Sequence, residues 1–183
     1  MATPVMAFAQ LATDCEKDGL NPHNGERIAA EIAKAFAVKP DEVAILRLEK
    51  TNLVFVYPAK LHNVGSIPLN TSGSVAARTA SAKRAEAINN FAQVRHASVF
   101  EAVELGAHRA EVIGLKPDGT PDKHQFMIQK LMSVPVMGLN GTAAGVIQVC
   151  RKGTSGPSSG ADFTPADVQK LATIAGALSK IFK

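Results

Sequence analysis

The chain has 183 residues, of which 46% are hydrophobic and 20% are charged, and its formal net charge is +4. This length suits one domain, and the apolar fraction is too high for an intrinsically disordered chain. No apolar run reaches the roughly 20 residues that a membrane span needs, and Asp14, Glu16 and Asp18 argue against a signal peptide. We therefore expect a cytoplasmic globular domain without a membrane partner.

The composition also bears on metals, redox chemistry and nucleic acids. Cys15 and Cys150 lie far apart and match no zinc spacing, and the five histidines show no helical pairing, so we expect no metal site. Both thiols are expected to be reduced core or interface residues. A redox role of Cys150, beside Arg151 and Lys152, is the less favoured alternative. The basic residues are scattered and Trp is absent, which argues against a nucleic-acid partner.

The beginning of the chain predicts two helices followed by a hairpin. Apolar residues recur at helical spacing over residues 4–17, and Asn21 is a start signal for a second helix over 22–37. Residues 42–49 and 52–58 alternate in hydrophobicity like two strands joined by a short turn. In the second strand, this alternation assigns one face to Leu53, Phe55 and Tyr57.

The middle of the chain has weaker signals. Residues 65–69 form a short extended segment, and the proline within it suits an edge strand or the end of a strand. Either Ser72 or Ser74 is expected to begin the next helix. Residues 83–93 show no clear pattern, and a helical turn or two is expected within 96–105.

Two long strands and a helix complete the chain. The apolar runs 125–137 and 143–151 flank Asn140-Gly141, which is a hairpin turn signal. Residues 153–161 have the composition of a flexible loop. Thr164 caps a final helix that extends to residue 182. This order of elements predicts an antiparallel sheet with helices packed on its faces.

Four stretches of sequence resemble, in this order, those of the GAF domain, a small-molecule sensor fold. They are GSIPL at 65–69 followed by a helix start at Ser74, AINN at 87–90, MSVPV at 132–136 and GVIQV at 145–149. The resemblance covers about Asn21 to Phe182. It implies an α+β fold in which a six-stranded antiparallel sheet has helices on both faces, with a pocket between one sheet face and a wall of helix and loop. It divides the chain into an N-terminal helix at 1–20, available for dimer contacts, and a GAF domain at 21–183 that ends in the helix 164–182.

The last stretch leads into a motif of GAF domains that bind cyclic nucleotides: Asn-Lys, a loop, Phe, three residues, then Asp-Glu. Lys152, Phe163 and Asp167 match this motif in order and spacing, whereas Arg151 and Val168 replace the Asn and the Glu. In that family the Lys and the Asp are thought to form a supporting ion pair. The resemblance therefore implies a structural ion pair between Lys152 and Asp167.

The resemblance further implies a sensory or regulatory domain that binds a small molecule. With no fused output domain, a signal would pass to a separate output protein or through a homodimer joined by the terminal helices. The ligand stays open, and a nucleotide or another anion is among the expected classes. Candidate ligand-binding residues are Arg47, Arg78, Asn89, Asn90, His96, Ser133 and Gln148. An anion would use Arg47 or Arg78, because the guanidinium fork matches a phosphate or carboxylate.

Two alternatives stay open. A non-catalytic dimerisation or protein-interaction module would have a pocket filled by its own side chains, with Phe91 and Phe100 as the obvious ones. An enzyme is not expected, because GAF-related enzymes that reduce free methionine sulfoxide have clustered cysteines. Bilin-binding members attach their chromophore to a Cys commonly followed by His, and nothing here selects an axial His for haem. No cofactor is therefore assigned.

Overall fold

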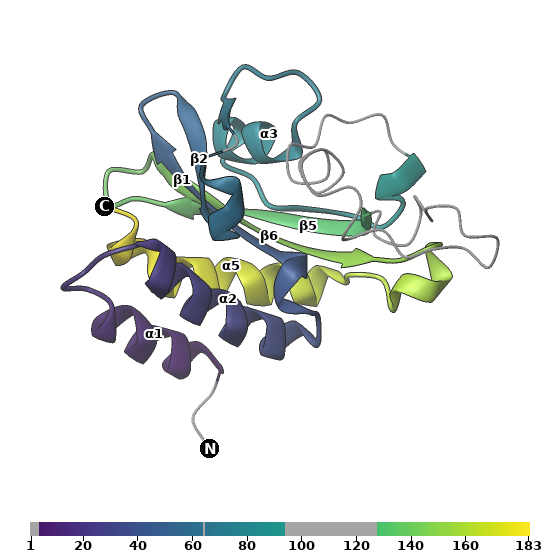
Figure 1. Cartoon of the computed structure of the whole chain (residues 1–183), viewed down its shortest axis with the longest axis horizontal. Coiled ribbons are helices and arrows are strands. Elements are labelled where there is room, and N and C mark those ends of the chain that lie inside the picture. Colours follow the sequence, from purple (N-terminus) through teal and green to yellow (C-terminus); the bar gives the residue numbers. More distant parts are fainter. Residues whose placement is uncertain (1–3, 64, 94–127) are drawn as a thin grey trace.

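The computed structural model describes residues 4–63, 65–93 and 128–183 (Figure 1). Its centre is a six-stranded sheet in the order β3-β2-β1-β6-β5-β4, and all neighbouring strands are antiparallel. The strands are β1 (Val43–Glu49), β2 (Asn52–Tyr57), β3 (Ser66–Pro68), β4 (Glu86–Ile88), β5 (Ile128–Met137) and β6 (Ala143–Lys152). Because β1 and β6 pair at the centre, segments far apart in the sequence hold the sheet together.

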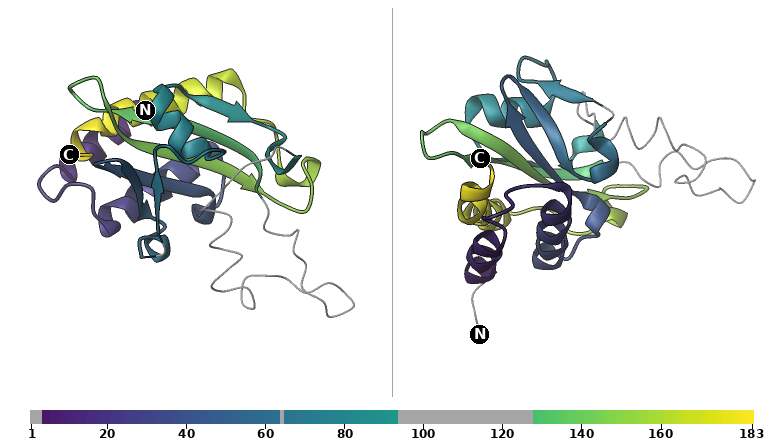
Figure 2. Two further views of the ribbon diagram at one scale, coloured as in Figure 1. Left: turned by 90° about the horizontal axis from the view of Figure 1, so that it is seen from above. Right: turned by 60° about the vertical axis from the view of Figure 1, so that its left-hand side comes forward.

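Among the described residues, three helices cover one face of the sheet, which we call the three-helix face, and one short helix lies on the other, the α3 face (Figure 2). The three-helix face carries α1 (Pro4–Asp14), α2 (Pro22–Phe36) and α5 (Pro165–Leu178), and the α3 face carries α3 (Val75–Ala82). The expected α+β fold, with a six-stranded antiparallel sheet and helices on both faces, is confirmed.

The helices begin at the capping residues that the sequence indicates. Asn21 caps α2 and Ser74 caps α3, each accepting a hydrogen bond from the backbone N–H three residues later. Thr164 and Asp167 form a reciprocal capping box at the start of α5. The predicted starts at Asn21 and Thr164 are confirmed, and Ser74 rather than Ser72 begins α3.

Each face of the sheet carries its own apolar cluster. The α3-face cluster includes Leu46, Phe55, Phe91, Val146 and Cys150, and the three-helix cluster includes Ile32, Val134, Ile147, Val149 and Leu171. Successive residues of β6 thus point to opposite faces, as the alternation in its sequence predicts.

The face predicted for the end of β2 is wrong. Phe55 shares a face with Leu53 as predicted, which is the α3 face, but Tyr57 packs on the three-helix face together with Val56. In the ladder, Ile45 pairs with Tyr57 and Leu46 with Phe55, so Val56 is the extra residue of a β-bulge. A bulge adds one residue to one strand and thereby reverses the alternation that follows it.

The middle of the chain differs most from the expectation. Residues 83–93, for which no element was predicted, contain the edge strand β4 and a 3-10 turn at Phe91–Gln93. The expected edge strand at 65–69 is confirmed as β3. The helix predicted within 96–105 lies outside the described residues. None of the helices that the structure describes is long and apolar enough to span a membrane.

Candidate functional site

A line of buried polar side chains lies on the α3 face of the sheet. Ser133 on β5 and Gln148 on β6 are directly opposite each other in the ladder. Gln148 Nε2 donates to Ser133 Oγ at 3.2 Å, and Ser133 Oγ lies 2.8 Å from Thr79 Oγ1 of α3. Thr79 Oγ1 is in turn 2.8 Å from the carbonyl oxygen of Val75, one helical turn earlier. The structure thus brings two predicted site residues together and adds Thr79 to them.

Ser133 is the acceptor at the centre of this line. Thr79 Oγ1 donates to Ser133 Oγ and also lies within hydrogen-bond distance of the Val75 carbonyl, and Ser133 Oγ accepts a second bond from Gln148 Nε2. The hydrogen bonds between described residues leave the Oε1 atom and one N–H of Gln148 available, and this residue is 6% exposed.

Small side chains on α3 allow this approach between the helix and the sheet. Ala76, Ala77 and Ala80 are all buried in the α3-face cluster, so nothing bulky separates the helix from β5 and β6. Around the polar line the face is apolar, and Phe91, which is 1% exposed, packs into the same cluster. A mainly apolar surface with a few placed polar atoms is typical of small-molecule sites.

The neighbouring candidates Asn89, Asn90 and His96 have different outcomes. Asn89 forms two hydrogen bonds with the backbone of Phe163, donating from Nδ2 to its carbonyl at 3.0 Å and accepting from its N–H at 2.8 Å. These bonds join the end of β4 to the start of α5, so the structure gives Asn89 a structural role. Asn90 is exposed, and His96 lies outside the described residues.

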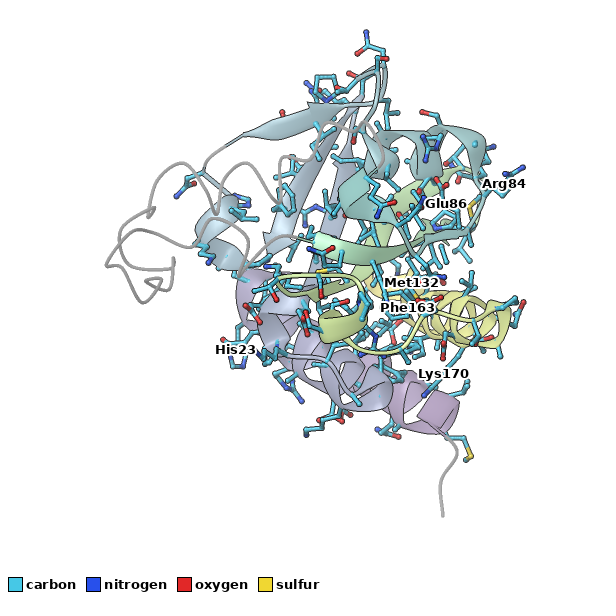
Figure 3. The ribbon with its side chains drawn as sticks, turned by 90° about the vertical axis from the view of Figure 1, so that its right-hand side faces the viewer. His23, Arg84, Glu86, Met132, Phe163 and Lys170 are labelled. Carbon is cyan, nitrogen blue, oxygen red and sulfur yellow. The ribbon has the colours of Figure 1, made fainter. Side chains whose placement is uncertain are left out.

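The two arginines expected to bind an anion each hold a carboxylate of the chain. Arg78 on α3 donates from Nε and Nη2 to the two oxygens of Glu86 on β4, at 2.9 and 3.0 Å, and Figure 3 shows Glu86 on the α3 side of the sheet. These bonds hold the pKa of Arg78 above its ordinary value. Arg47 donates to Glu49 at 2.5 and 3.1 Å and to the Leu20 carbonyl at 3.0 Å.

The predicted ion pair of Lys152 and Asp167 is not among the contacts that the structure gives for these side chains. The Asp167 carboxylate accepts from the N–H and hydroxyl of Thr164, at 2.8 and 3.0 Å, because it sits in the helix cap. Lys152 Nζ donates to the Asp41 carbonyl at 3.0 Å. An ion pair is instead formed between Lys130 Nζ and Asp162 Oδ1, which are 2.7 Å apart.

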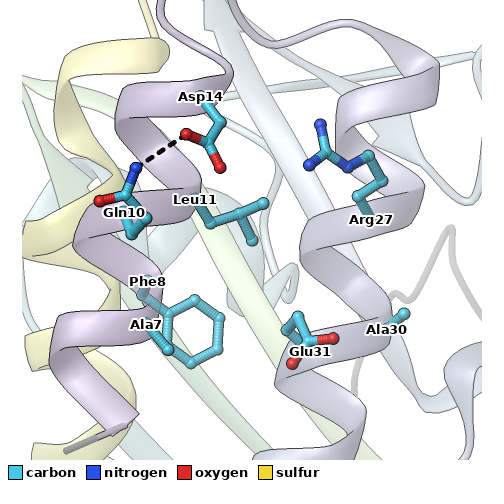
Figure 4. Close-up of a pocket in the computed structure, with 8 residues that line it drawn as sticks. All are labelled: Ala7, Phe8, Gln10, Leu11, Asp14, Arg27, Ala30 and Glu31. Atoms are coloured by element: carbon cyan, nitrogen blue, oxygen red, sulfur yellow. Dashed lines mark hydrogen bonds between the residues drawn. The ribbon is translucent and has the colours of Figure 1, made fainter. Parts of the chain in front are cut away.

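A groove of about 510 Å³ separates α1 from α2 on the outside of the helix layer (Figure 4). Phe8 and Leu11 line it, and Asp14 and Arg27 lie opposite each other across it. Much of the α1 stripe expected at a dimer interface is buried within the chain, with Phe8, Ala12 and Cys15 in the three-helix cluster. Met6, by contrast, is 63% exposed. Dimerisation through the terminal helices stays a prediction.

The two cysteines lie on opposite faces of the sheet and are fully buried, Cys15 in the three-helix cluster and Cys150 in the α3-face cluster. Burial raises the pKa of the Cys15 thiol, and the nearby Arg27 guanidinium, 3.7 Å from Sγ, lowers it by less. Within residues 4–63, 65–93 and 128–183, no three His, Cys, Asp or Glu side chains are grouped to hold a metal ion.

Comparison with known proteins shows which solved structures share this architecture. No family model matches the sequence, and no match is found among the curated proteins. Solved structures do match. The GAF domain of a phosphoenolpyruvate-protein phosphotransferase from Acinetobacter has 15% identity and a TM-score of 0.63, covering 100% of this chain and 94% of its own. The nlh2 GAF domain of A. aeolicus in an inactive state has 13% identity and a TM-score of 0.62, covering 98% and 93%.

A third match is fRMsr of Staphylococcus aureus in complex with substrate, with 15% identity and a TM-score of 0.56. The alignment covers 100% of this chain and 98% of that one. Identities this low establish the fold alone. On that evidence, the chain has the fold of a GAF domain.

Proposed function

We propose that this chain is a sensory or regulatory domain that binds a small organic molecule on the α3 face of the sheet. The observation that carries the proposal is Gln148, whose Oε1 atom and second N–H are left available by the buried line of hydrogen bonds. An amide held in one orientation and surrounded by apolar side chains selects among ligands, because a mismatched ligand leaves it unpaired. The likeness to GAF domains supports the regulatory class.

The chemistry of the α3 face favours a ligand with a neutral polar edge. The amide of Gln148 presents an acceptor and a donor side by side, which pair with the donor and acceptor edge of a nucleobase or another amide. Arg78 is held by Glu86 through both carboxylate oxygens. An anionic group of the ligand would therefore have to compete with a bidentate ion pair.

Thermal unfolding tests this proposal, after denaturing mass spectrometry has identified any molecule that copurifies. The panel contains cyclic nucleotides, nucleotides, nucleobases, amino acids and 2-oxo acids. A ligand at about 100 times its dissociation constant stabilises by roughly 2.7 kcal/mol, which raises Tm by about 5 to 10 °C for a chain of this size. A shift confined to one chemical class would support the proposal and identify that class.

Two matched variants locate the site. Gln148→Met keeps the volume of the side chain and removes its amide, so we expect about a two- to tenfold weaker affinity for the ligand. Gln129→Met is the control, because Gln129 is also buried but donates to the Gly153 carbonyl at 2.9 Å. Equal losses in the two variants, or none in Gln148→Met, would contradict a site at Gln148.

A second candidate function is a non-catalytic dimerisation or protein-interaction module, and Phe91 favours it. This ring is 1% exposed within the α3-face cluster and therefore occupies space that a ligand would need. In this case the panel would be flat, and Phe91→Ala would gain binding of an apolar probe such as indole through the cavity that it creates. Binding of a panel member by the unmodified chain would decide against it.

We also propose that the chain is not an enzyme and that it forms a homodimer. Both thiols are fully buried, so iodoacetamide applied to the folded protein should leave ligand binding intact. Met6 is more exposed than Val5, the other exposed large apolar side chain of α1. We expect Met6→Glu to convert a dimer to a monomer in sedimentation, since it places charge in an apolar contact, without changing Tm by more than about 1 °C.

A further inference from the structure

Arg151 on β6 differs from Arg47 on β1 and Arg78 on α3 in what surrounds its guanidinium. Arg47 and Arg78 each hold a carboxylate, whereas the recorded hydrogen bond of Arg151 runs from Nη2 to the Phe36 carbonyl at a long 3.4 Å. Its Nε is the one buried side-chain N or O atom without a hydrogen-bond partner in the described part of the chain. A guanidinium has five N–H donors, so most of its donor capacity is unused.

The guanidinium is nevertheless held in place. Its Cζ atom lies 5.0 Å from the centroid of the Phe163 ring, a cation–π contact that orients the plane of the group. On another side lies Gly160, where even a Cβ atom would come within 3.5 Å of Nη1. Gly160 has no side chain, so the backbone of its loop passes close to the Arg151 guanidinium and no side chain at this position covers it. An oriented cation with unused donors is a preorganised binder of oxyanions.

The residue opposite Arg151 adds positive charge. Lys130 pairs with Arg151 in the β5–β6 ladder. Its side chain is 6% exposed, and Nζ bonds to the Gly160 carbonyl at 2.6 Å and to Asp162 at 2.7 Å. Asp162 is itself 68% exposed, so solvent weakens its neutralisation of Lys130.

The next groups around Arg151 are a further cation and a carboxylate that the backbone already binds. Lys170 donates to the Ala35 carbonyl at 2.5 Å and lies over the Phe36 ring, which adds a third cation near Arg151, and Figure 3 shows Lys170 and Phe163 on the α5 side of the sheet. The buried carboxylate of Glu42 accepts from the backbone N–H groups of Lys39 and Lys152, at 2.7 and 2.8 Å. The Glu42 carboxylate is thus engaged by the backbone.

We propose that Arg151 binds a small oxyanion, a phosphate or carboxylate group, through the guanidinium N–H groups that the long bond to the Phe36 carbonyl leaves unused. Lys130 raises the local positive potential, and Asp162 competes with the anion for these cations. The site lies on the three-helix face, across the sheet from Gln148, so it is separate from the proposed ligand site. It also differs from the expected anion site at Arg47 or Arg78, which stays a prediction.

Thermal unfolding with added inorganic phosphate tests the site, with chloride adjusted to keep the ionic strength constant. At ten times its dissociation constant, phosphate should raise Tm by about 3 to 6 °C and the rise should saturate. Arg151→Gln should abolish this rise. Arg47→Gln is the matched control and should keep it, since Arg47 lies on the same face but is paired with Glu49.

A second variant keeps the proposal testable if Arg151→Gln fails to fold. Asp162 is exposed, so Asp162→Asn should fold and bind phosphate about three- to tenfold more tightly, because a competing negative charge is removed. Acetate titrated in parallel separates a carboxylate from a phosphate preference, and a saturable rise with either supports the site. The absence of a rise with both anions, an unchanged rise in Arg151→Gln, or weaker binding in Asp162→Asn would overturn it.

Discussion

The two faces of the sheet are built for different tasks. On the three-helix face, α1, α2 and α5 enclose an apolar cluster, and the cations Lys130 and Arg151 lie toward the ends of their strands. On the α3 face, the short helix α3 lies against the sheet, and a polar line runs through the cluster itself. Burying polar atoms lowers stability unless each is paired, so they are retained where specificity matters more than packing.

This difference predicts that substitutions on the two faces have different effects on stability and on ligand binding. On the three-helix face they should lower the free energy of unfolding without altering a ligand on the other side of the sheet. On the α3 face they should lower it by less and alter binding. The predictions below test this division, from the largest expected effect to the smallest.

Gly145→Ala should be the most destabilising change on the three-helix face. A Cβ atom at this position would meet the Leu46 carbonyl oxygen of the neighbouring strand and lie 2.6 Å from the Phe182 ring. Neither the strand backbone nor a buried ring moves easily, so we expect a loss of about 3 kcal/mol in urea unfolding. Gly156→Ala is the control, with nothing within 4 Å of its Cβ, and should change stability by less than about 0.5 kcal/mol. Similar losses for the two would contradict a packing limit at Gly145.

Thr79→Val should have a smaller effect, because it keeps the shape of the side chain and removes only its hydroxyl. Ser133 Oγ then loses the hydroxyl group that donates to it, which should lower stability by about 1 to 3 kcal/mol. Combining it with Ser133→Ala removes both partners, and the double variant should be about 1 kcal/mol more stable than additive losses imply. Additive losses in urea unfolding would show that the line does not act as a unit.

Asn89→Ala tests the connection between β4 and α5. It removes two hydrogen bonds to the Phe163 backbone and should lower stability by about 1 to 2 kcal/mol. Asn90→Ala is the matched control, one residue further and exposed, and should change it by less than about 0.5 kcal/mol. If Asn89 instead bound the ligand, its variant would weaken ligand binding more than it lowers the urea midpoint.

Local signals account for the part of the fold that the sequence predicts. The starts of α2 and α5 depend on a capping side chain and an N–H three residues away, so Asn21 and Thr164 mark them without knowledge of the rest. The long strands show their alternation directly. By contrast, β4 has three residues, too few to show a period. The bulge at Val56 depends on how β2 aligns with β1, which alternation along β2 alone does not contain.

The site residues, too, are predictable only where a local signal marks them. Ser133 and Gln148 were predicted from a resemblance in their strands, and the ladder then places them opposite each other. Thr79 was missed, although it is a polar residue one helical turn after Val75 in an alanine-rich helix, a position that faces the core.

Both arginines expected to bind an anion are paired with carboxylates of the chain, and their role in anion binding stays a prediction. Arg47 and Glu49 are two residues apart on one strand and share a face, so their pairing was visible in the alternation. To predict the pairing of Arg78 with Glu86, one must know that α3 lies beside β4. That Arg151 Nε has no hydrogen-bond partner among the described residues can be known only from the whole surrounding structure.

The smallest predicted effect concerns the Cys15 thiol in the closed three-helix cluster. Burial raises its pKa in the folded chain above the ordinary value of 9.0 that applies when the chain is unfolded. Above about pH 9 the unfolded chain therefore releases a proton that the folded chain keeps, and stability falls with rising pH until the folded pKa is passed. Below pH 9 the contribution of this thiol is complete.

Cys15→Ala removes this titration. Urea midpoints measured at about pH 8 and pH 10 should fall further for the unmodified chain than for the variant, even though the variant begins with the lower midpoint because it leaves a small cavity. Other groups that titrate in this range, Tyr57 among them, are common to both chains and cancel in the comparison. An equal fall in the two chains would mean that solvent reaches Cys15 in the folded state, and the three-helix face would then be less closed than its packing indicates.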